Sequence, residues 1–174
     1  MAKLRPAICY KTPKRPYTRV SKYKRASFVT GVPGSKIRKF DMGQTNGDFE
    51  IEVGFKCHDN IQIRHNALEA FRISANRNLE KKLGKNNYHL KLKIYPHHVM
   101  RHNPTANFAG ADRFSSGMSH CFGKALGRAA IVKKDQMISF IRAKKSDLKD
   151  IKETFRIAGN KLGCKYNLEV KDLK

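Results

Sequence analysis

Apolar residues recur at helical spacing in two segments of the chain. In 148–162 and in 68–79 they lie three and four positions apart, which places them on one face of a helix. A glycine follows a leucine at the end of each segment, at Gly84 and Gly163, as is typical of helix C-termini. Ser146 is placed to cap the start of the later helix. We therefore predict two amphipathic helices that bury their apolar stripes.

The two helical segments belong to an internal repeat. The sequence E-A-F-R-I-S-A-N-R-N-L at 69–79 resembles E-T-F-R-I-A-G-N-K-L at 153–162, and each copy precedes a segment of alternating polarity. Such alternation predicts a strand with one buried face. Strands are predicted at 49–57, 88–94, 136–142 and 166–170. These elements predict an α+β fold, a two-layer domain in which a mostly antiparallel sheet is packed by two amphipathic helices.

Charge changes the picture of the N-terminal segment. The 174 residues include 37 Lys+Arg against 14 Asp+Glu, so that the net charge is +23. Residues 1–40 hold no Asp or Glu, and aromatic residues are interleaved with their Lys and Arg. We predict that 1–40 is an extended basic arm that follows RNA and stacks aromatic rings on bases, while 41–174 forms the folded domain. A disordered, solvated tail is the alternative.

A long segment without periodicity, about 96–128, lies between the two copies of the repeat. It is rich in glycine and in histidine, and Asp112 is its one carboxylate. Glycine lets backbone N–H groups approach phosphate oxygens, so we predict a long Gly-rich internal loop that contacts RNA. The stretch 117–124 is not a nucleotide-binding P-loop, because its glycines are too far apart and Ala125 follows the lysine.

The remaining chemistry predicts neither an enzyme nor a metal site. The cysteines are far apart, which is typical of free thiols in a reducing, cytoplasmic compartment; they are Cys9, Cys57, Cys121 and Cys164. Cys and His occur side by side rather than at zinc-ligand spacing, so zinc is a weak alternative. No paired carboxylates or other catalytic motif meets the requirements of an active site, and an enzyme acting on RNA stays only as an alternative. No cofactor is predicted.

A membrane partner is also not predicted. No run approaches the roughly 20 apolar residues that a spanning helix needs. A peripheral membrane protein would need a basic helix with an exposed apolar face, whereas both predicted helices use their apolar stripes against the sheet.

Short motifs across nearly the whole chain carry a family resemblance. They are K-R-P-Y-T-R at 14–19, G-V-P-G-S-K-I at 31–37, F-D-M-G at 40–43, Y-P-H-H-V at 95–99 and A-G-A-D-R at 109–113. In their joint order and spacing, they resemble the archaeal branch of the large-subunit ribosomal protein family called L-sixteen in bacteria and L-ten-e in archaea and eukaryotes.

The resemblance implies a structural constituent of the large ribosomal subunit. Such a protein would bind ribosomal RNA near the 5S RNA and the aminoacyl-tRNA site, contact neighbouring ribosomal proteins and help to position tRNA in the cytoplasm. A free RNA-binding regulator or RNA chaperone is the alternative. The implied RNA-binding residues are Arg5, Lys11, Lys14, Arg15, Tyr17, Arg19, Lys22, Lys24, Arg25, Lys36, Arg38, Arg101, Lys124 and Arg128. The implied tRNA-facing residues are His102, Asn103, Gly110, Ala111, Asp112, Arg113 and Gly117.

Replacing Arg113 with Ala should slow translation elongation and leave the melting temperature of the protein nearly unchanged. The reason is that Arg113 lies in a polar, Gly-rich segment with no predicted role in the core. Elongation rates of ribosomes carrying the variant, measured together with thermal unfolding of the free protein, test this. An unchanged elongation rate with a lowered melting temperature would contradict it.

Overall fold

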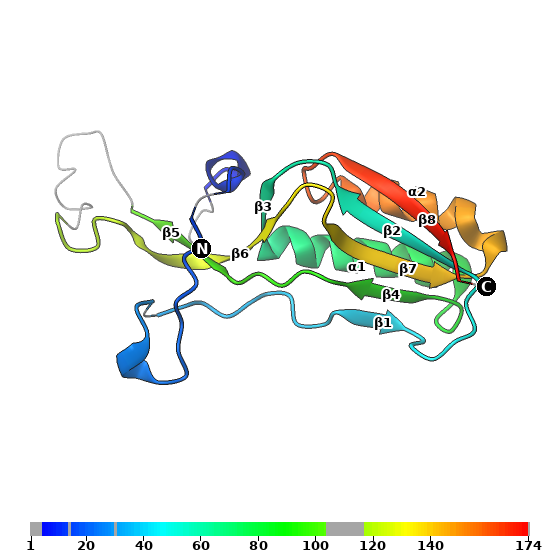
Figure 1. Cartoon of the computed structure of the whole chain (residues 1–174), viewed down its shortest axis with the longest axis horizontal. Helices are drawn as coiled ribbons and strands as arrows, with labels where there is room; N and C mark the ends of the chain where they lie inside the picture. Colours follow the sequence, from blue (N-terminus) through cyan, green and yellow to red (C-terminus); the bar gives the residue numbers. More distant parts are fainter. Residues whose placement is uncertain (1–4, 14, 30, 104–116, 174) are drawn as a thin grey trace.

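Two antiparallel sheets and two helices form the structure, a computed structural model that describes residues 5–13, 15–29, 31–103 and 117–173 (Figure 1). In sheet order, the five-stranded sheet contains β1 (Asp41–Gly43), β4 (His89–Leu92), β7 (Met137–Ala143), β2 (Ile51–Cys57) and β8 (Tyr166–Asp172). The three-stranded sheet contains β3 (Ile61–Arg64), β6 (Lys124–Val132) and β5 (His98–His102). The helices are α1 (His65–Leu83) and α2 (Leu148–Gly159).

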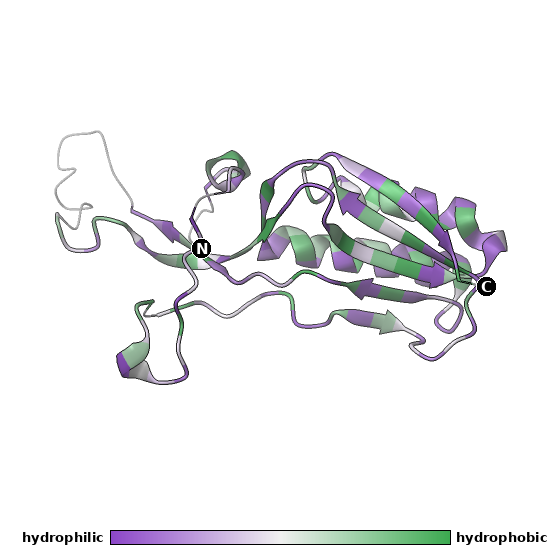
Figure 2. Ribbon diagram, viewed as in Figure 1, coloured by the Kyte–Doolittle hydropathy of each residue, from purple (hydrophilic) through white to green (hydrophobic). Residues whose placement is uncertain are grey.

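Both helices lie against one face of the five-stranded sheet and bury the stripes that the sequence predicts (Figures 1 and 2). On α1 the buried apolar residues are Leu68, Phe71, Ala75 and Leu79, and on α2 they are Ile151, Phe155 and Ala158. The alternation of the predicted strand at 88–94 also holds, since Leu90, Leu92 and Ile94 are buried. The predicted two-layer α+β fold is confirmed.

An aromatic cluster joins the helices to the sheet at Phe55. The ring of this β2 residue stacks on Tyr166 of β8 with 4.4 Å between ring centroids, and it lies 5.4 Å from both Phe71 and Phe155. Phe71 and Phe155 occupy equivalent positions in the two copies of the repeat. The repeat therefore supplies each helix with one aromatic residue that packs against the same strand.

The helix ends agree only partly with the prediction. Gly84 ends α1 in the left-handed region, with φ +80°, and its N–H donates to the carbonyl oxygen of Glu80. The second helix ends at Gly159, before the predicted end; a Cβ at this position would lie 2.9 Å from the ring of Tyr166, which explains the glycine. The prediction that Ser146 caps this helix is wrong, since its hydroxyl donates to the carboxylate of Asp147 and accepts no hydrogen bond from a helical N–H.

The prediction missed β1, β3, β5 and β6. Both ends of the segment 96–128, predicted as a loop, are strands that pair antiparallel as β5 and β6. Gly127 interrupts the apolar pattern of β6, because a Cβ at this position would come within 3.2 Å of the His65 ring. In β5, a register shift between Met100 and Arg101 breaks the alternation of buried and exposed residues. The strands form an extended ribbon that projects from one end of the helix-covered body (Figure 1).

A bend joins the body to this ribbon. The pairing of β2 with β7 continues as the pairing of β3 with β6, and between them the N–H of Asp135 donates to the carbonyl of Cys57 at 2.8 Å. Asn60 accepts the N–H of Lys134 through its side-chain oxygen, also at 2.8 Å. Asp135 has φ +60°, a conformation that Asp tolerates better than most residues. The two sheets are therefore one pairing with a bend in it.

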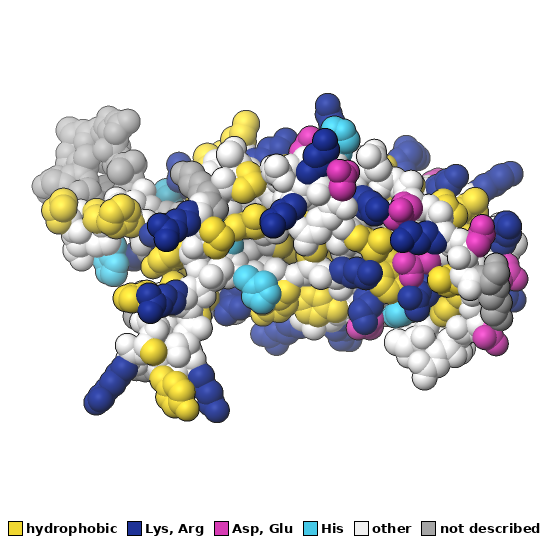
Figure 3. All heavy atoms as spheres, in the orientation of Figure 1, with side chains coloured by type: hydrophobic (Ala, Val, Ile, Leu, Met, Phe, Trp, Pro, Cys, Tyr) yellow, Lys and Arg dark blue, Asp and Glu magenta, His cyan; other side chains and the backbone are white. Residues whose placement is uncertain are grey.

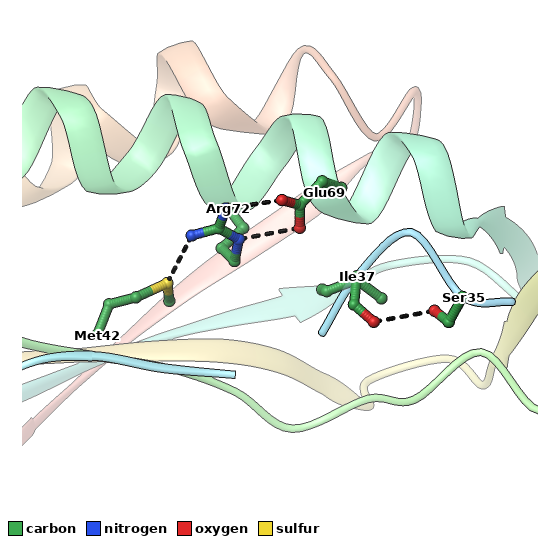
Figure 4. Close-up of polar contacts among 5 residues, drawn as sticks. All are labelled: Ser35, Ile37, Met42, Glu69 and Arg72. Carbon is green, nitrogen blue, oxygen red and sulfur yellow. Dashed lines mark hydrogen bonds and ion pairs between the residues drawn. The ribbon is translucent and has the colours of Figure 1, made fainter. Parts of the chain in front are cut away.

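The last part of the basic segment contributes to the core. Ile37 is 1% exposed and lies beside α1, where Arg72 donates two hydrogen bonds to the Glu69 carboxylate and one to the sulfur of Met42 (Figure 4). The hydroxyl of Ser35 donates to the carbonyl of Ile37. The chain that leads from the arm into β1 is thus held against the helix by apolar and polar contacts together.

Replacing Phe55 with Ala should lower the free energy of unfolding by about 3–5 kcal/mol, because it empties the centre of the aromatic cluster. Urea unfolding of the full chain measures this. Phe122→Ala is the control, since this side chain is 80% exposed and its loss should change stability by less than about 0.5 kcal/mol. Similar losses in both variants would show that the cluster does not hold the body together.

Candidate nucleic-acid interface

Acidic and basic side chains are segregated along the molecule. Among the described residues of 5–40, 61–64, 93–103 and 117–134 there is no Asp or Glu. Figure 3 shows the carboxylates gathered over the body, whereas Lys and Arg extend over the ribbon and the arm. We call this region, the arm together with the three-stranded sheet, the acid-free end. Its excess of positive charge attracts a polyanion.

Many basic residues of the body, by contrast, have acidic partners. Lys56 pairs with Glu169 at 2.8 Å, and Arg142 pairs with Glu52 at the same distance. Both pairs lie on the sheet face opposite the helices, in agreement with the strand registers. This face therefore presents a mixed, largely neutralised surface rather than a positive one.

The arm crosses the three-stranded sheet from one edge to the other. The carbonyl of Lys11 accepts the N–H of Gln62 on β3 at 2.9 Å, and the carbonyl of Tyr17 accepts the N–H of Val99 on β5 at 2.9 Å. Strands β3 and β5 are the two edges of this sheet. The arm thus accepts hydrogen bonds from backbone N–H groups that an edge strand would otherwise leave unpaired. Its own basic side chains lie on the outer surface.

Two buried histidines hold the arm in place. The ring nitrogen Nδ1 of His98 accepts the backbone N–H of Tyr17 at 2.9 Å, and Nδ1 of His65 accepts the backbone N–H of Lys36 at 3.3 Å. A nitrogen that accepts a hydrogen bond carries no proton, so both contacts require the neutral imidazole.

Burial and nearby positive charge keep these rings neutral. Removal from water is the main cause that lowers the pKa of both His98 and His65 below the ordinary 6.5. The charges that add to this are Arg101 for His98, and Lys36, Arg128 and Arg64 for His65. The same cations that make the end positive therefore favour the neutral rings that fix the arm.

Guanidinium groups stack on aromatic rings of the arm. The Cζ atom of Arg101 lies 3.9 Å from the centroid of the Tyr17 ring, and that of Arg19 lies 4.0 Å from the Phe28 ring. A guanidinium held against a ring face is oriented in advance and still exposes donors at its edge. The interleaving of aromatic and basic residues, which predicted stacking on bases, also serves this internal stacking.

The predicted RNA-binding residues are mostly exposed on the acid-free end. The exposed ones are Arg5, Lys11, Arg15, Arg19, Lys22, Arg25, Lys36, Arg38 and Lys124. Lys24 lies in a short 3-10 turn, Lys24–Ala26, and Lys14 lies outside the described residues. Tyr17 and Arg101 are half-buried in their stack. Arg128 is also half-buried, since it donates to the carbonyl of Pro33 at 3.0 Å and to the Tyr95 hydroxyl at 3.3 Å.

The predicted tRNA-facing residues lie at the tip of the ribbon or beyond the described chain. His102 is the last residue of β5, and Asn103 donates to the carbonyl of Cys121 at 3.4 Å. Gly117 has φ +58°, a left-handed conformation that suits glycine. Gly110, Ala111, Asp112 and Arg113 lie outside the described residues.

The sequence reasoning missed the two histidines that anchor the arm. His98 falls in the motif Y-P-H-H-V, but nothing in the sequence separates it from the exposed His97. Burial decides between them, and burial follows from the pairing of β5 with β6. Arg64 was missed as well; its guanidinium donates to the carbonyl of Arg5 at 3.0 Å and so holds the first described turn of the arm.

The described part of the chain offers little for other chemistry. It holds no group of three or more His, Cys, Asp or Glu residues that could bind a metal ion. Its cysteines carry free thiols, and burial beside Cys57 raises the pKa of Cys164 to about 12, which makes that thiol unreactive at neutral pH. None of the helices within these residues has the length and apolar character of a membrane span.

Comparison with known proteins gives a consistent result. Residues 13–169 match the family described as Ribosomal protein L16p/L10e. The chain is 42% identical to the large ribosomal subunit protein uL16 of Staphylothermus marinus over 171 residues, which cover 98% of this chain and 95% of that protein. It is 45% identical to the uL16 protein of Methanospirillum hungatei over 148 residues, 85% and 87% of the two chains. It is 41% identical to the uL16 protein of Sulfolobus acidocaldarius over 172 residues, which cover 98% of this chain and 95% of that protein.

Docking of the arm should weaken as the pH falls below about 6.5. His98 and His65 have a lower pKa in the folded protein than in the unfolded chain, so their contribution to stability is present above the unfolded value. It is lost as the pH falls through the folded value. Amide hydrogen exchange of Val99 and Tyr17, measured from about pH 7.5 to about pH 5, follows the docking. The protection of both amides, corrected for intrinsic exchange, should fall with pH.

The variant His98→Asn keeps a hydrogen-bond acceptor that cannot titrate in this range. It should lose most of the pH dependence at these two amides. His97→Gln removes an exposed neighbour and should keep the full dependence. The explanation is wrong if His98→Asn and the unmodified chain respond to pH alike.

Proposed function

The chain belongs to the L16p/L10e family of ribosomal proteins and is a structural constituent of the large ribosomal subunit, and we propose that its acid-free end is the surface that binds ribosomal RNA. This membership confirms the prediction that the protein is not an enzyme. It also makes ribosomal RNA and neighbouring ribosomal proteins its partners. In archaea, the source of these relatives, the ribosome is cytoplasmic, as predicted.

The observation that supports the proposed surface is the segregation of charge. Basic side chains of the arm and ribbon have no carboxylate among the described residues of that end, whereas several of those of the body form ion pairs, as Lys56 does with Glu169 and Arg142 with Glu52. Lys and Arg that neutralise phosphates release the counterions condensed on RNA, which favours binding. Arginine adds a planar fork that matches two phosphate oxygens, and the folded shape of the RNA provides most of the specificity.

We further propose that the protein binds near the 5S RNA and that the ribbon directs its tip toward aminoacyl-tRNA. The support is twofold. The ribbon of β5 and β6 projects from the body, and residues 103–123 connect its two strands in the sequence (Figure 1). The motif A-G-A-D-R at 109–113, on which the family resemblance partly rests, falls within that segment. The two strands rise about 3.3 Å per residue, so their length sets how far the tip of the ribbon lies from the body.

Sedimentation of a cell extract tests the function as a whole. The protein should travel with large subunits in a sucrose gradient, in stoichiometric amount. A majority that sediments slowly would favour the alternative of a free RNA-binding regulator or RNA chaperone.

Removing two charges from the arm should weaken RNA binding far more than removing two from the helix face. The double variant Arg15→Gln with Lys22→Gln changes exposed arm residues, and Lys149→Gln with Lys152→Gln makes the same charge change on exposed residues of α2. Binding to a large-subunit RNA fragment is measured at several salt concentrations. The slope of log affinity against log salt should fall by about two for the arm variant, about one for each lost phosphate contact.

The α2 variant should keep the slope of the unmodified protein. Equal losses in the two variants would mean that RNA responds to net charge alone, and the assignment of binding to the acid-free end would then be wrong.

A further inference from the structure

A hollow of about 430 Å³ lies between the arm and the ribbon. The arm contributes Tyr17, Phe28 and Val29 to its lining, and the ribbon contributes Arg101, Lys124 and Ala125. The volume is within the range of sites that hold a small organic group. The hollow exists because the arm turns back on itself: the N–H groups of Phe28 and Val29 both donate to the carbonyl of Arg19, at 3.2 and 3.3 Å.

The lining combines aromatic faces with positive charge. Phe28 is 62% exposed although the guanidinium of Arg19 lies over its ring, so a large part of the ring is open to a ligand. Arg101 is held against Tyr17 at the other side, and its own carbonyl accepts the Tyr10 hydroxyl at 3.2 Å. Lys124 is exposed at the rim. Among the lining residues that the structure describes, there is no Asp or Glu.

We propose that this hollow binds one unpaired nucleotide, with its base against Phe28 and its phosphate near Arg101 and Lys124. The inference rests on the proposed binding of ribosomal RNA and names a part of that interface. A bare phosphate would use the cations but leave the open ring without a partner. The bases of a duplex are stacked inside the helix, so a base that reaches the ring comes from a single-stranded loop, bulge or end. The site gives no reason to prefer one base, since every base has a face that stacks.

The test uses the full chain and a six-residue single-stranded RNA that carries 2-aminopurine at one position, whose fluorescence falls when the base stacks. Titration should quench this fluorescence. Phe28→Leu should weaken binding of this RNA about tenfold, the order expected for one base stacked on one ring. The same variant should bind an otherwise identical strand, abasic at that position, as the unmodified chain does. Phe28→Tyr should retain the affinity.

Tyr23→Leu is the matched control, because Tyr23 is 73% exposed on the same part of the arm but lies outside the hollow. It should leave the affinity unchanged. Thermal unfolding of all three variants should match that of the unmodified chain, since neither ring is buried. The proposal is overturned if Phe28→Leu and Tyr23→Leu lose the same affinity, or if Phe28→Leu weakens the abasic strand equally.

Two further measurements separate the remaining explanations. Adenosine monophosphate should bind much more weakly than the strand; equal affinity would assign the hollow to a free nucleotide. A polyglutamate peptide should not relieve the quenching at matched charge, whereas full competition would indicate a site for acidic protein segments. If the variants show no base effect while the RNA fragment still binds at the acid-free end, only the nucleotide site is wrong. If the unmodified chain binds no RNA, the proposed function itself fails.

Discussion

The bent pairing of residues 51–64 with 129–143 is the constraint on which the rest of the structure depends. One half of it, β2 with β7, forms the centre of the five-stranded sheet, and Phe55 fixes that half to both helices. The other half, β3 with β6, carries the edge that the arm covers. Because the same two segments of the chain run through both halves, the packing of the body determines where the ribbon and the arm project.

The sequence predicts the body well because its signals are local. Helical stripes and strand alternation within each copy of the repeat depend on residues a few positions apart, and both copies form the predicted helix followed by a strand. The ribbon is harder to predict, since its strands are shaped by contacts with distant residues. Gly127 weakens the strand pattern of β6, yet it is the residue that leaves room for His65 of α1. A single-sequence pattern does not contain that contact.

The candidate interface, too, has features that the sequence predicts and features that depend on contacts between distant residues. That the arm is basic and aromatic can be read from composition alone, and most of the predicted residues are exposed there. Which cations are directed outward and which are used internally cannot be read in this way. Arg128 contacts Pro33 and Tyr95 of its own chain, although its sequence neighbourhood resembles that of the exposed Lys124. The difference arises because Arg128 lies where the ribbon meets the chain that leads out of the arm.

A chain with net charge +23 must hold its most basic segment against a body that is itself positive. Ion pairs cannot do this at the acid-free end, where the described residues include no carboxylate. Backbone hydrogen bonds to β3 and β5, two neutral histidines and guanidinium–aromatic stacks take their place. None of these contacts neutralises a cation. The arm is therefore ordered without losing the charge that attracts RNA, and bound phosphates would relieve the repulsion that remains.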